Sequence, residues 1–585
     1  MRSSFGSRIP AAAPLAAAVA ALGVGSTHAQ TTERVSLDSN GFQGNVNSQF
    51  PSIAGYGRYV AFHSDASNLV ANDTNATRDI FVRDRQSGIT QRVSVSSSGA
   101  QANARSDYPS ISADGRFVAF ESAASNLVAV DTNTSNDVFV RDRQNGTTER
   151  VSVSSTGVQS APSAYSSFAS ISADGRFVAF TSYAPNLVVG DTNGAADVFV
   201  RDRVSGTTER VSVDSNGVEG DSGSSNASIS VDGRFVAFWG DASNLVVGDT
   251  NATYDVFVRD RQLGTTERVS VDSAGAQGTD GSYSPSISAD GRWVAFYSFA
   301  NNLVASDTNP NADIFVRDRV NGTTEIASVA TNGTAADSYS HYPSISADGR
   351  IVAFHSNASN LVANDTNGLV DVFLRDRQLG TTERVSVDSN GAQAITQYSY
   401  SASVSADGRF VAFWSAAWDL VPGDTNGSWD VFVRDRGPQI PSTYCTAGTT
   451  SNGCNASIAA DAPPSVSFAN ACHITVTGVE GQKTGIVFYG LQRLSQPWCS
   501  QGGGNSFLCV KAPTNRTGVQ NSGGSFGACD GSLSLDWNAF QLANPSALGA
   551  PWSAGTTADV QAWFRDPPSC KTTSLSNAVE LLYFP

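Results

Sequence analysis

Seven loops share the pattern Asp-Thr-Asn-x-x-x-Asp, whose side-chain oxygens are of the type that binds a divalent cation. Carboxylate and amide oxygens at alternate positions resemble the beginning of a calcium-binding loop. The fit is partial, because the fifth position varies and no glutamate stands at the twelfth. Asp and Asn side chains also cap turns by accepting hydrogen bonds from backbone N–H groups, so calcium sites and structural turns both remain open. The candidate ligands are Asp73, Asn75, Asp79, Asp131, Asn133, Asp137, Asp191, Asn193, Asp197, Asp249, Asn251, Asp255, Asp307, Asn309, Asp313, Asp365, Asn367, Asp371, Asp424, Asn426 and Asp430.

A second set of candidates comes from positions that differ between otherwise similar repeats. Positions alike in all repeats serve the fold, whereas positions that vary are free to serve a ligand. One variable position follows each Val-Ala-Phe triplet, and another precedes each Pro/Ala-Ser-Ile/Val segment. Many of these residues are aromatic, which favours a binding face, although packing between loops is the alternative. The candidate ligand-binding residues are His63, Glu121, Trp239, Tyr297, His355, Trp414, Tyr108 and Tyr342.

Both sets belong to one sequence repeat that recurs at a nearly constant period, once for each Asp-Thr-Asn triplet. In the second copy, four short strands are predicted over residues 109–112, 116–120, 137–141 and 148–153. The Asp-Gly pair between the first two is typical of a hairpin, and alternating β-branched and aromatic residues indicate the third. Alternating strand direction places the two variable positions on the same face. Four strands per unit, without helical periodicity, predict an all-β fold of the β-propeller type.

The two ends of the array are offset by one strand. A Thr-Thr-Glu-Arg-Val-Ser segment at residues 31–36 precedes the first repeat, and the last repeat stops at Arg434-Asp-Arg436 without a fourth strand. A seven-bladed ring closed by the N-terminal strand explains both facts and leaves no open sheet edge. An open solenoid is the alternative. Arg-Asp-Arg ends the third strand seven times and predicts charge pairs between neighbouring strands or blades.

The sequence of the repeat resembles that of a known family. Ser112-Ala-Asp-Gly-Arg-Phe-Val-Ala-Phe120, followed by Asp137-Val-Phe-Val-Arg-Asp142, is similar to the WD40-like β-propeller repeat of TolB-type proteins. The resemblance covers residues 31–436. It implies a propeller that serves as a binding platform, and it implies no particular ligand, because one fold hosts many functions.

Residues 1–29 carry Arg2, Arg8 and an Ala-rich apolar run that ends in Thr27-His-Ala29, which predicts a secretory signal peptide. No later stretch has the length of a membrane span. The net charge of −16 argues against nucleic acid and anionic membrane surfaces as partners, because both attract basic patches. We therefore expect a protein that is secreted, periplasmic or on the cell surface.

All seven cysteines follow the repeats, at Cys445, Cys454, Cys472, Cys499, Cys509, Cys529 and Cys570. In an exported chain this clustering predicts a small disulfide-stapled domain with one cysteine left over. Strand-like runs at 473–477, 485–489 and 559–564 favour a β-sandwich. Val479-Glu-Gly-Gln-Lys483 and Trp563-Phe-Arg-Asp-Pro567 are similar to segments of an uncharacterised C-terminal domain of exported bacterial proteins. The predicted organisation is a signal peptide (1–29), a propeller (30–436), a linker (437–441) and a Cys-rich β domain (442–585).

These patterns favour a binding or scaffold protein that recognises a protein or a glycan with its variable face. A glycan hydrolase or lyase is the alternative, but acid catalysis needs two carboxylates, and Glu121 is the only acid at the first variable position. A structural surface protein attached through its C-terminal domain is the third reading. Calcium is the only cofactor that the residues suggest.

Overall fold

The computed structural model of the 585-residue chain describes residues 30–437 in full. In the C-terminal part it describes residues 443–444, 456–460, 464, 472–479, 481–490, 493–497, 507–510, 514–523, 525, 528–545, 547–548, 557–565 and 573–582. The predicted signal peptide and most of the predicted linker lie outside these residues. Nowhere in the described part does a helix combine the length and the apolar character that crossing a bilayer requires.

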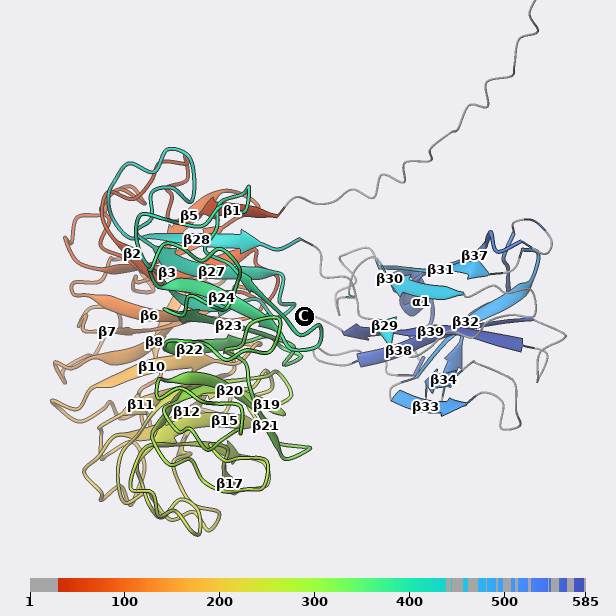
Figure 1. Ribbon diagram of the computed structural model, residues 1–585. Coiled ribbons are helices and arrows are strands. Elements are labelled where there is room, and N and C mark those ends of the chain that lie inside the picture. The colour runs from red at the N-terminus through yellow and green to blue at the C-terminus, as the bar shows by residue number, and fades with distance from the viewer. Residues whose placement is uncertain are drawn as a thin grey trace, which may run out of the picture.

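Residues 31–435 form seven four-stranded antiparallel sheets, numbered here in chain order (Figure 1). Sheet 1 contains β2 (Ser48–Ile53), β3 (Tyr59–Ser64), β4 (Asp79–Asp84) and β5 (Ile89–Arg92). Sheet 2 contains β6 (Ser106–Ile111), β7 (Phe117–Ser122), β8 (Asp137–Asp142) and β9 (Thr147–Arg150). Sheet 3 contains β10 (Ser166–Ile171), β11 (Phe177–Ser182), β12 (Asp197–Asp202) and β13 (Thr207–Arg210). Sheet 4 contains β14 (Ser224–Ile229), β15 (Phe235–Gly240), β16 (Asp255–Asp260) and β17 (Thr265–Arg268).

The remaining three sheets follow the same order. Sheet 5 contains β18 (Ser282–Ile287), β19 (Trp293–Ser298), β20 (Asp313–Asp318) and β21 (Thr323–Ile326). Sheet 6 contains β22 (Ser340–Ile345), β23 (Ile351–Ser356), β24 (Asp371–Asp376) and β25 (Thr381–Arg384). Sheet 7 contains β26 (Ser399–Val404), β27 (Phe410–Ser415), β28 (Asp430–Asp435) and, as its fourth strand, β1 (Thr31–Arg34). The predicted all-β fold of repeated four-stranded sheets is thus confirmed and is consistent with a β-propeller.

The strand predictions differ from the structure mainly at the ends. In sheet 2 the first strand begins at Ser106 rather than at residue 109, because a bulge lets the chain pair on both sides of Tyr108 and Pro109. The fourth strand ends at Arg150 rather than at residue 153. Beyond it the chain leaves the sheet edge, and Val153 forms an isolated bridge with Gln159.

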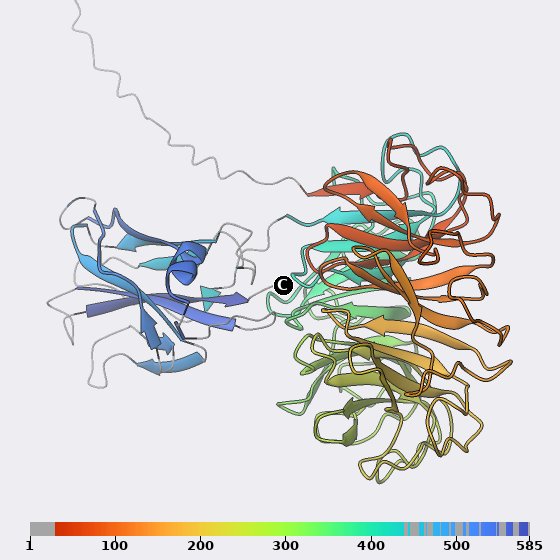
Figure 2. The same ribbon diagram turned by 180° about the vertical axis from the view of Figure 1, so that it is seen from behind.

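The strand that precedes the first repeat pairs with the last one. β1 runs antiparallel to β28, with Thr31 opposite Asp435 and Arg34 opposite Phe432. Figures 1 and 2 show β1 in red beside β28 in cyan, although the two strands stand at opposite ends of the repeat array in the sequence. The expected offset between the two ends of the array is therefore present as a strand pair.

Two cycles of hydrogen bonds connect the sheets to one another. In the first cycle a backbone N–H donates to a backbone carbonyl of the next sheet at 3.0–3.2 Å, and the last donor, Ala406, returns to Gly55 of sheet 1. In the second cycle a serine hydroxyl of one sheet accepts from a backbone N–H of the next sheet at 3.0–3.2 Å, and Ser403 accepts from Ile53. The members of the first cycle are Gly55, Ala113, Ala173, Val231, Ala289, Ala347 and Ala406.

The hydrophobic core of the repeats lies between neighbouring sheets. Val82 of sheet 1 packs in one buried cluster with Val118 and Phe120 of sheet 2, and equivalent clusters recur along the chain. One cluster joins Phe62 of sheet 1 to Val433 of sheet 7. Alternation in each strand supplies these side chains, because successive residues point to opposite faces of a sheet.

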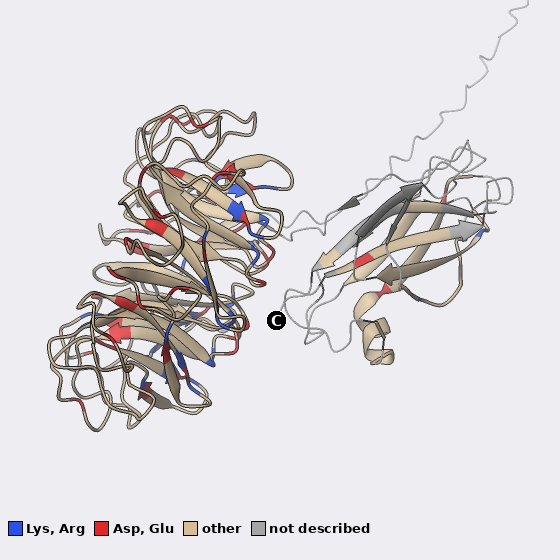
Figure 3. Ribbon diagram, turned by 90° about the horizontal axis from the view of Figure 1, so that it is seen from below, with Lys and Arg blue, Asp and Glu red and all other residues tan. Residues whose placement is uncertain are grey.

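The turns between strands carry the predicted charge pairs. Figure 3 shows basic positions next to acidic ones in the sheets. Within a sheet, Arg116 bonds Asp142 at 2.7 Å, and this guanidinium lowers the pKa of that carboxyl to about 2. Between sheets, Arg203 pairs with Glu149. The glycine of each Asp-Gly-Arg turn is required, because Gly115 has a φ of +73° and an added Cβ would stand 2.1 Å from the Tyr59 ring.

The described residues of the C-terminal part form two main sheets and one short helix. The larger sheet contains β29 (Thr443–Tyr444), β39 (Thr573–Leu582), β38 (Thr557–Arg565), β32 (Thr484–Gly490), β35 (Thr514–Arg516) and β36 (Gln520–Asn521). The second contains β30 (Ser457–Ala460), β31 (His473–Val479) and β37 (Gly531–Asp536), and a pair is formed by β33 (Arg493–Pro497) and β34 (Phe507–Val510). Helix α1 (Trp537–Ala543) is capped by Asp536.

One core joins both main sheets of this part. Ile474 and Val476 of β31 belong to the same buried cluster as Val487 of β32 and Val560 of β38. Two sheets around one shared core are a sandwich-like arrangement. Cys472 is buried, and Cys529 is disulfide-bonded. Cys445, Cys454, Cys499 and Cys570 also lie outside the described residues, so the full disulfide framework stays a prediction.

Candidate functional site

The first strand of every repeat carries a strained bulge at one of the two variable positions. In sheet 2 the register between β6 and β7 shifts between Asp107 and Ser110, and Tyr108 has a φ of +48°. Left-handed backbone at a bulky residue costs about 1–3 kcal/mol and is retained where the surroundings fix it. A bulge re-aims the side chain that it contains. The seven equivalent residues have φ values of +47° to +53° and are Phe50, Tyr108, Phe168, Asn226, Ser284, Tyr342 and Ser401.

These seven residues surround one pocket. Its volume is about 490 Å³, and a narrower section of about 250 Å³ is lined by the bulge residue and its successor from all seven sheets. Every sheet thus contributes equivalent positions to this cavity, which all seven sheets share. The wider section, called here the axial pocket, is lined by Phe50, Tyr108, Phe168, Ser225, Asn226, Trp239, Tyr283, Ser284, Tyr297, Tyr342, His355, Tyr400, Ser401 and Trp414.

The structure brings six of the eight predicted ligand-binding residues to the axial pocket. Tyr108 and Tyr342 come from bulges, and Trp239, Tyr297, His355 and Trp414 follow Val-Ala-Phe triplets. His63 and Glu121 are not among the lining residues. Both are buried, and the His63 ring packs behind Phe50, with ring centroids 5.2 Å apart.

Eight lining residues were not among the predicted ligand-binding residues, and five of them stand at the variable bulge position: Phe50, Phe168, Asn226, Ser284 and Ser401. The other three stand at a position that the sequence analysis did not single out. Ser225, Tyr283 and Tyr400 stand one position before a bulge residue. That position also varies between repeats, so the argument used for its neighbours would have found it. It was overlooked because strict alternation places adjacent residues on opposite faces, whereas a bulge lets both approach the same side.

The rings around the axial pocket form an unbroken arc. Neighbouring ring centroids are 4.8–5.7 Å apart along the whole series, to which every sheet contributes. Contacts of this length are favourable for aromatic pairs. Ser225 and Asn226 stand in the gap between the two ends of the arc. In order, the arc comprises Trp239, Tyr283, Tyr297, Tyr342, His355, Tyr400, Trp414, Phe50, Tyr108 and Phe168.

Three residues after Val-Ala-Phe triplets hold a bulge of the next sheet in place. A Glu121 carboxylate oxygen accepts a hydrogen bond from the backbone N–H of Phe168 at 3.2 Å. The Thr181 hydroxyl accepts from Asn226 N–H at 3.0 Å, and His355 Nδ1 accepts from Ser401 N–H at 3.4 Å. These variable side chains therefore position the residues that line the pocket.

The lining carries no ionised group. None of the lining residues is Asp, Glu, Lys or Arg, and burial lowers the pKa of His355 to about 3, so its imidazole is neutral at physiological pH. Charge lies one layer further out, where Arg78 bonds Asp107 at 2.8 Å. Burial, with the Asp107 charge nearby, raises the pKa of Glu121 to about 7.

In six of the seven Asp-Thr-Asn loops an arginine of the fourth strand places its guanidinium where the calcium hypothesis requires a cation. In sheet 4, Arg268 Nη1 lies 3.0 Å from Asp249 and 3.2 Å from Asp255, while Asn251 and Ser270 donate hydrogen bonds to Asp255. The guanidinium satisfies both carboxylates from within the chain. Equivalent pairs are made by Arg34, Arg92, Arg150, Arg210 and Arg384.

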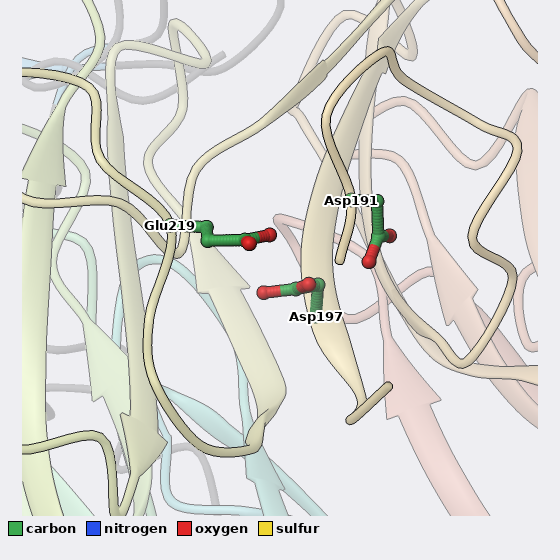
Figure 4. A group of neighbouring side chains, drawn as sticks. All are labelled: Asp191, Asp197 and Glu219. Atoms are coloured by element: carbon green, nitrogen blue, oxygen red, sulfur yellow. The ribbon is translucent and has the colours of Figure 1, made fainter. Parts of the chain in front are cut away.

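The fifth loop is the exception, because Ile326 stands where the other repeats have arginine. Asp307 and Asp313 are buried, and Asp313 accepts hydrogen bonds from Ser328 and Asn309. With burial uncompensated by a cation, the pKa of Asp313 rises to about 7. The third loop has an additional carboxylate, because Glu219 joins Asp191 and Asp197 in one acidic group (Figure 4). Arg210 contacts all three of those carboxylates.

No family model matches the chain, and no curated protein sequence matches it. Among solved structures it is similar to an oligogalacturonate lyase in complex with manganese, with 12% identity over 71% of this chain and 95% of that chain and a TM-score of 0.43. It is also similar to TolB from Acinetobacter baumannii, with 14% identity over 58% and 62% of the chains and a TM-score of 0.33. A puromycin-hydrolysing peptidase of Mycobacterium tuberculosis has 11% identity over 74% and 59%, with a TM-score of 0.40.

Proposed function

We propose that this chain is an exported binding protein whose seven sheets are the blades of a propeller closed by β1, with a protein or glycan ligand in the axial pocket. The observation that carries the proposal is the arc of aromatic rings around a pocket of about 490 Å³. Pockets of about 300–1,000 Å³ with apolar walls and a few polar groups are the usual form of ligand sites. Strain retained at all seven bulges is also characteristic of functional sites.

Closure is supported by three independent contacts between sheets 7 and 1. The two hydrogen-bond cycles return to their starting sheet, and a buried cluster joins Phe62 to Val433. In addition, Arg34 of β1 supplies the guanidinium for Asp424 and Asp430 of sheet 7. An open solenoid would leave those two acids unpaired.

A glycan-active enzyme is the second candidate. Asp107 stands directly opposite Glu121 across β6 and β7, so a pair of carboxylates exists that the variable positions alone did not indicate. Both are buried, at 3% and 5% exposure, and neither lines the axial pocket. A general acid must reach the bond that it protonates, so this placement favours binding over hydrolysis. A structural surface protein attached through its C-terminal domain is the third candidate.

The proposal is tested with arrays of glycans and peptides probed by the fluorescently labelled mature chain, residues 30–585. The Phe168→Ala/Tyr342→Ala double variant removes two rings of the arc, and Trp418→Ala removes an exposed ring that does not line the pocket. We expect a signal that the double variant loses and Trp418→Ala keeps. Equal signals from all three proteins would show that ligands bind elsewhere.

A further inference from the structure

The axial pocket has the chemistry of a carbohydrate site. Its aromatic arc presents ring faces and edges over most of the circumference, and aromatic faces attract the weakly positive C–H groups of a sugar ring. Polar groups stand among the rings, from the hydroxyls of Ser284 and Ser401 and from Ser225 and Asn226 in the gap of the arc. A pyranose has the same two kinds of surface, with apolar C–H patches on its faces and hydroxyl groups around its edge.

Charge selects among the sugars. No carboxylate, ammonium or guanidinium group belongs to the residues that line the pocket, and the His355 imidazole is neutral because burial lowers its pKa to about 3. The carboxylate of an acidic sugar would lose its hydration in the pocket and find no cationic side chain there. The ammonium group of an amino sugar would likewise find no anionic side chain. Burying an unpaired charge is costly. The pocket therefore suits a neutral ligand.

Binding of an extended peptide is disfavoured by the hydrogen bonds that the first strand of each sheet, called here the inner strand, and the turn after it already make. A peptide that adds to a sheet edge needs free backbone N–H and C=O groups. Here the N–H of Ile111 donates to Ser52 and the N–H of Ala113 to Ala173, and the same bonds recur in every sheet. Three of the seven bulge N–H groups are also used, since those of Phe168, Asn226 and Ser401 donate to side chains of the preceding sheet. The ring of inner strands has few backbone donors left for a peptide.

Two donors on the wall have no partner among the described residues. The indole N–H groups of Trp239 and Trp414 are buried there without a hydrogen-bond acceptor, and both rings line the pocket. Unsatisfied buried donors are rare in folded proteins and call for an explanation. Each N–H is itself buried from solvent, so a ligand oxygen would reach it only after a shift of the surrounding side chains.

We propose that the axial pocket binds a short neutral oligosaccharide, with sugar faces against the aromatic arc and hydroxyl groups directed to Ser225, Asn226, Ser284 and Ser401. This inference rests on the proposed binding function and narrows its ligand to one class. The variable residues would then determine which oligosaccharide binds, because each sheet supplies either a ring or a hydroxyl at its own place around the pocket.

The test is isothermal titration of the mature chain with three probe sets: neutral hexose oligosaccharides, uronic-acid oligosaccharides of the same lengths, and proline-rich peptides. Wild type is compared with Tyr342→Ala, Asn226→Ala and the exposed-ring control Trp418→Ala. We expect binding of neutral oligosaccharides alone, weakened about tenfold or more by Tyr342→Ala and Asn226→Ala and unchanged by Trp418→Ala. Circular dichroism and melting of each variant show that its fold is retained.

The other outcomes separate the two proposals. Pocket-dependent binding of uronic-acid oligosaccharides or peptides would overturn the neutral-sugar inference and leave the axial pocket as the binding site. Binding of any probe that is indifferent to Tyr342→Ala and Asn226→Ala would overturn both, and no binding of neutral oligosaccharides would overturn the neutral-sugar inference.

Discussion

The backbone N–H of Phe168 donates a hydrogen bond of 3.2 Å to the carboxylate of Glu121 on the preceding sheet. The donor belongs to a residue with a φ of +51°, so the bond holds a strained bulge at the edge of the axial pocket. Burial raises the pKa of the Glu121 carboxyl to about 7; the bond from Phe168 opposes this rise, and the Asp107 charge adds to it. A group that fixes the pocket thus also makes stability depend on pH.

Glu121→Gln keeps an oxygen acceptor for Phe168 and removes the charge. Because the folded pKa of Glu121 lies above its ordinary value of 4.5, the wild type should lose stability as pH rises from about 4.5 through 7. The variant should lack this loss and exceed the wild type by about 1–3 kcal/mol at pH 8, with little difference at pH 4. Urea unfolding at pH 4 and pH 8 measures the free energy of unfolding of the variant and of the wild type. Glu121→Ala, which removes the acceptor, should be destabilised at both, and a Gln variant weaker than wild type at pH 8 would contradict the argument.

Ile326→Arg should give the fifth loop the guanidinium that the other six possess. Asp313, whose pKa is raised to about 7, would gain a cationic partner, and the decline of stability between about pH 4 and 7 should become shallower. We expect a gain of about 1.5–3 kcal/mol at pH 8, the range for hydrogen bonds to charged groups. The neutral control Ile326→Gln has similar length. Equal gains for Arg and Gln would mean that charge is not the cause.

Calcium should add little to the six loops that contain arginine, because the carboxylates of Asp249 and Asp255 already share Arg268. Those six loops should therefore contribute no difference between the melting temperature of the protein in millimolar calcium and its melting temperature in chelator. Any calcium-dependent shift should persist in Asp249→Ala/Asp255→Ala and vanish in Asp307→Asn/Asp313→Asn. A shift that the first double variant abolishes would restore the calcium hypothesis for the arginine-containing loops.

Deleting residues 31–37 should expose the edge of β28 and leave Asp424 and Asp430 without Arg34. Arg34→Ala alone should cost about 3–5 kcal/mol, as should Arg268→Ala in sheet 4, because each leaves a buried acid unpaired. The deletion should cost more than either and promote aggregation. Differential scanning calorimetry provides the comparison. A deletion no worse than Arg34→Ala would argue against a closed ring.

The cysteines should form three disulfides within residues 445–570 and leave one thiol unpaired or paired between molecules. Peptide mapping of the exported protein by mass spectrometry, with and without reduction, identifies the pairs. Cys529 is expected among them, since it is disulfide-bonded in the structure. Seven free thiols would contradict both the stapled domain and the exported location.

The repeat unit made much of the fold predictable, because strand alternation and the Asp-Gly hairpin are local signals. The partner of each Asp-Thr-Asn loop was not predicted. Arg150 belongs to the strand after the one that follows Asp131 and was interpreted only as part of that strand, and Arg34 lies at the opposite end of the array from Asp424. The bulge was not predicted either, since a positive φ at Tyr108 is unfavourable for that side chain.

The candidate site was likewise predictable in part. Variation between repeats indicated Trp414 and Tyr342, because that comparison needs no coordinates. It did not separate residues that line the pocket from those behind them, such as Glu121, since both kinds vary. Only the distances between sheets make that distinction.

The backbone bond from Ala406 to Gly55 makes the inner cycle indifferent to where the chain begins. Each of the seven turns donates to one neighbour and accepts from another, so none is first or last. For the ring proposed above, a circularly permuted gene for residues 30–437, with those two residues joined and new termini cut in a loop between any two sheets, would then encode the same arrangement of sheets. The order in which the sheets are synthesised is thus separable from the architecture that they form.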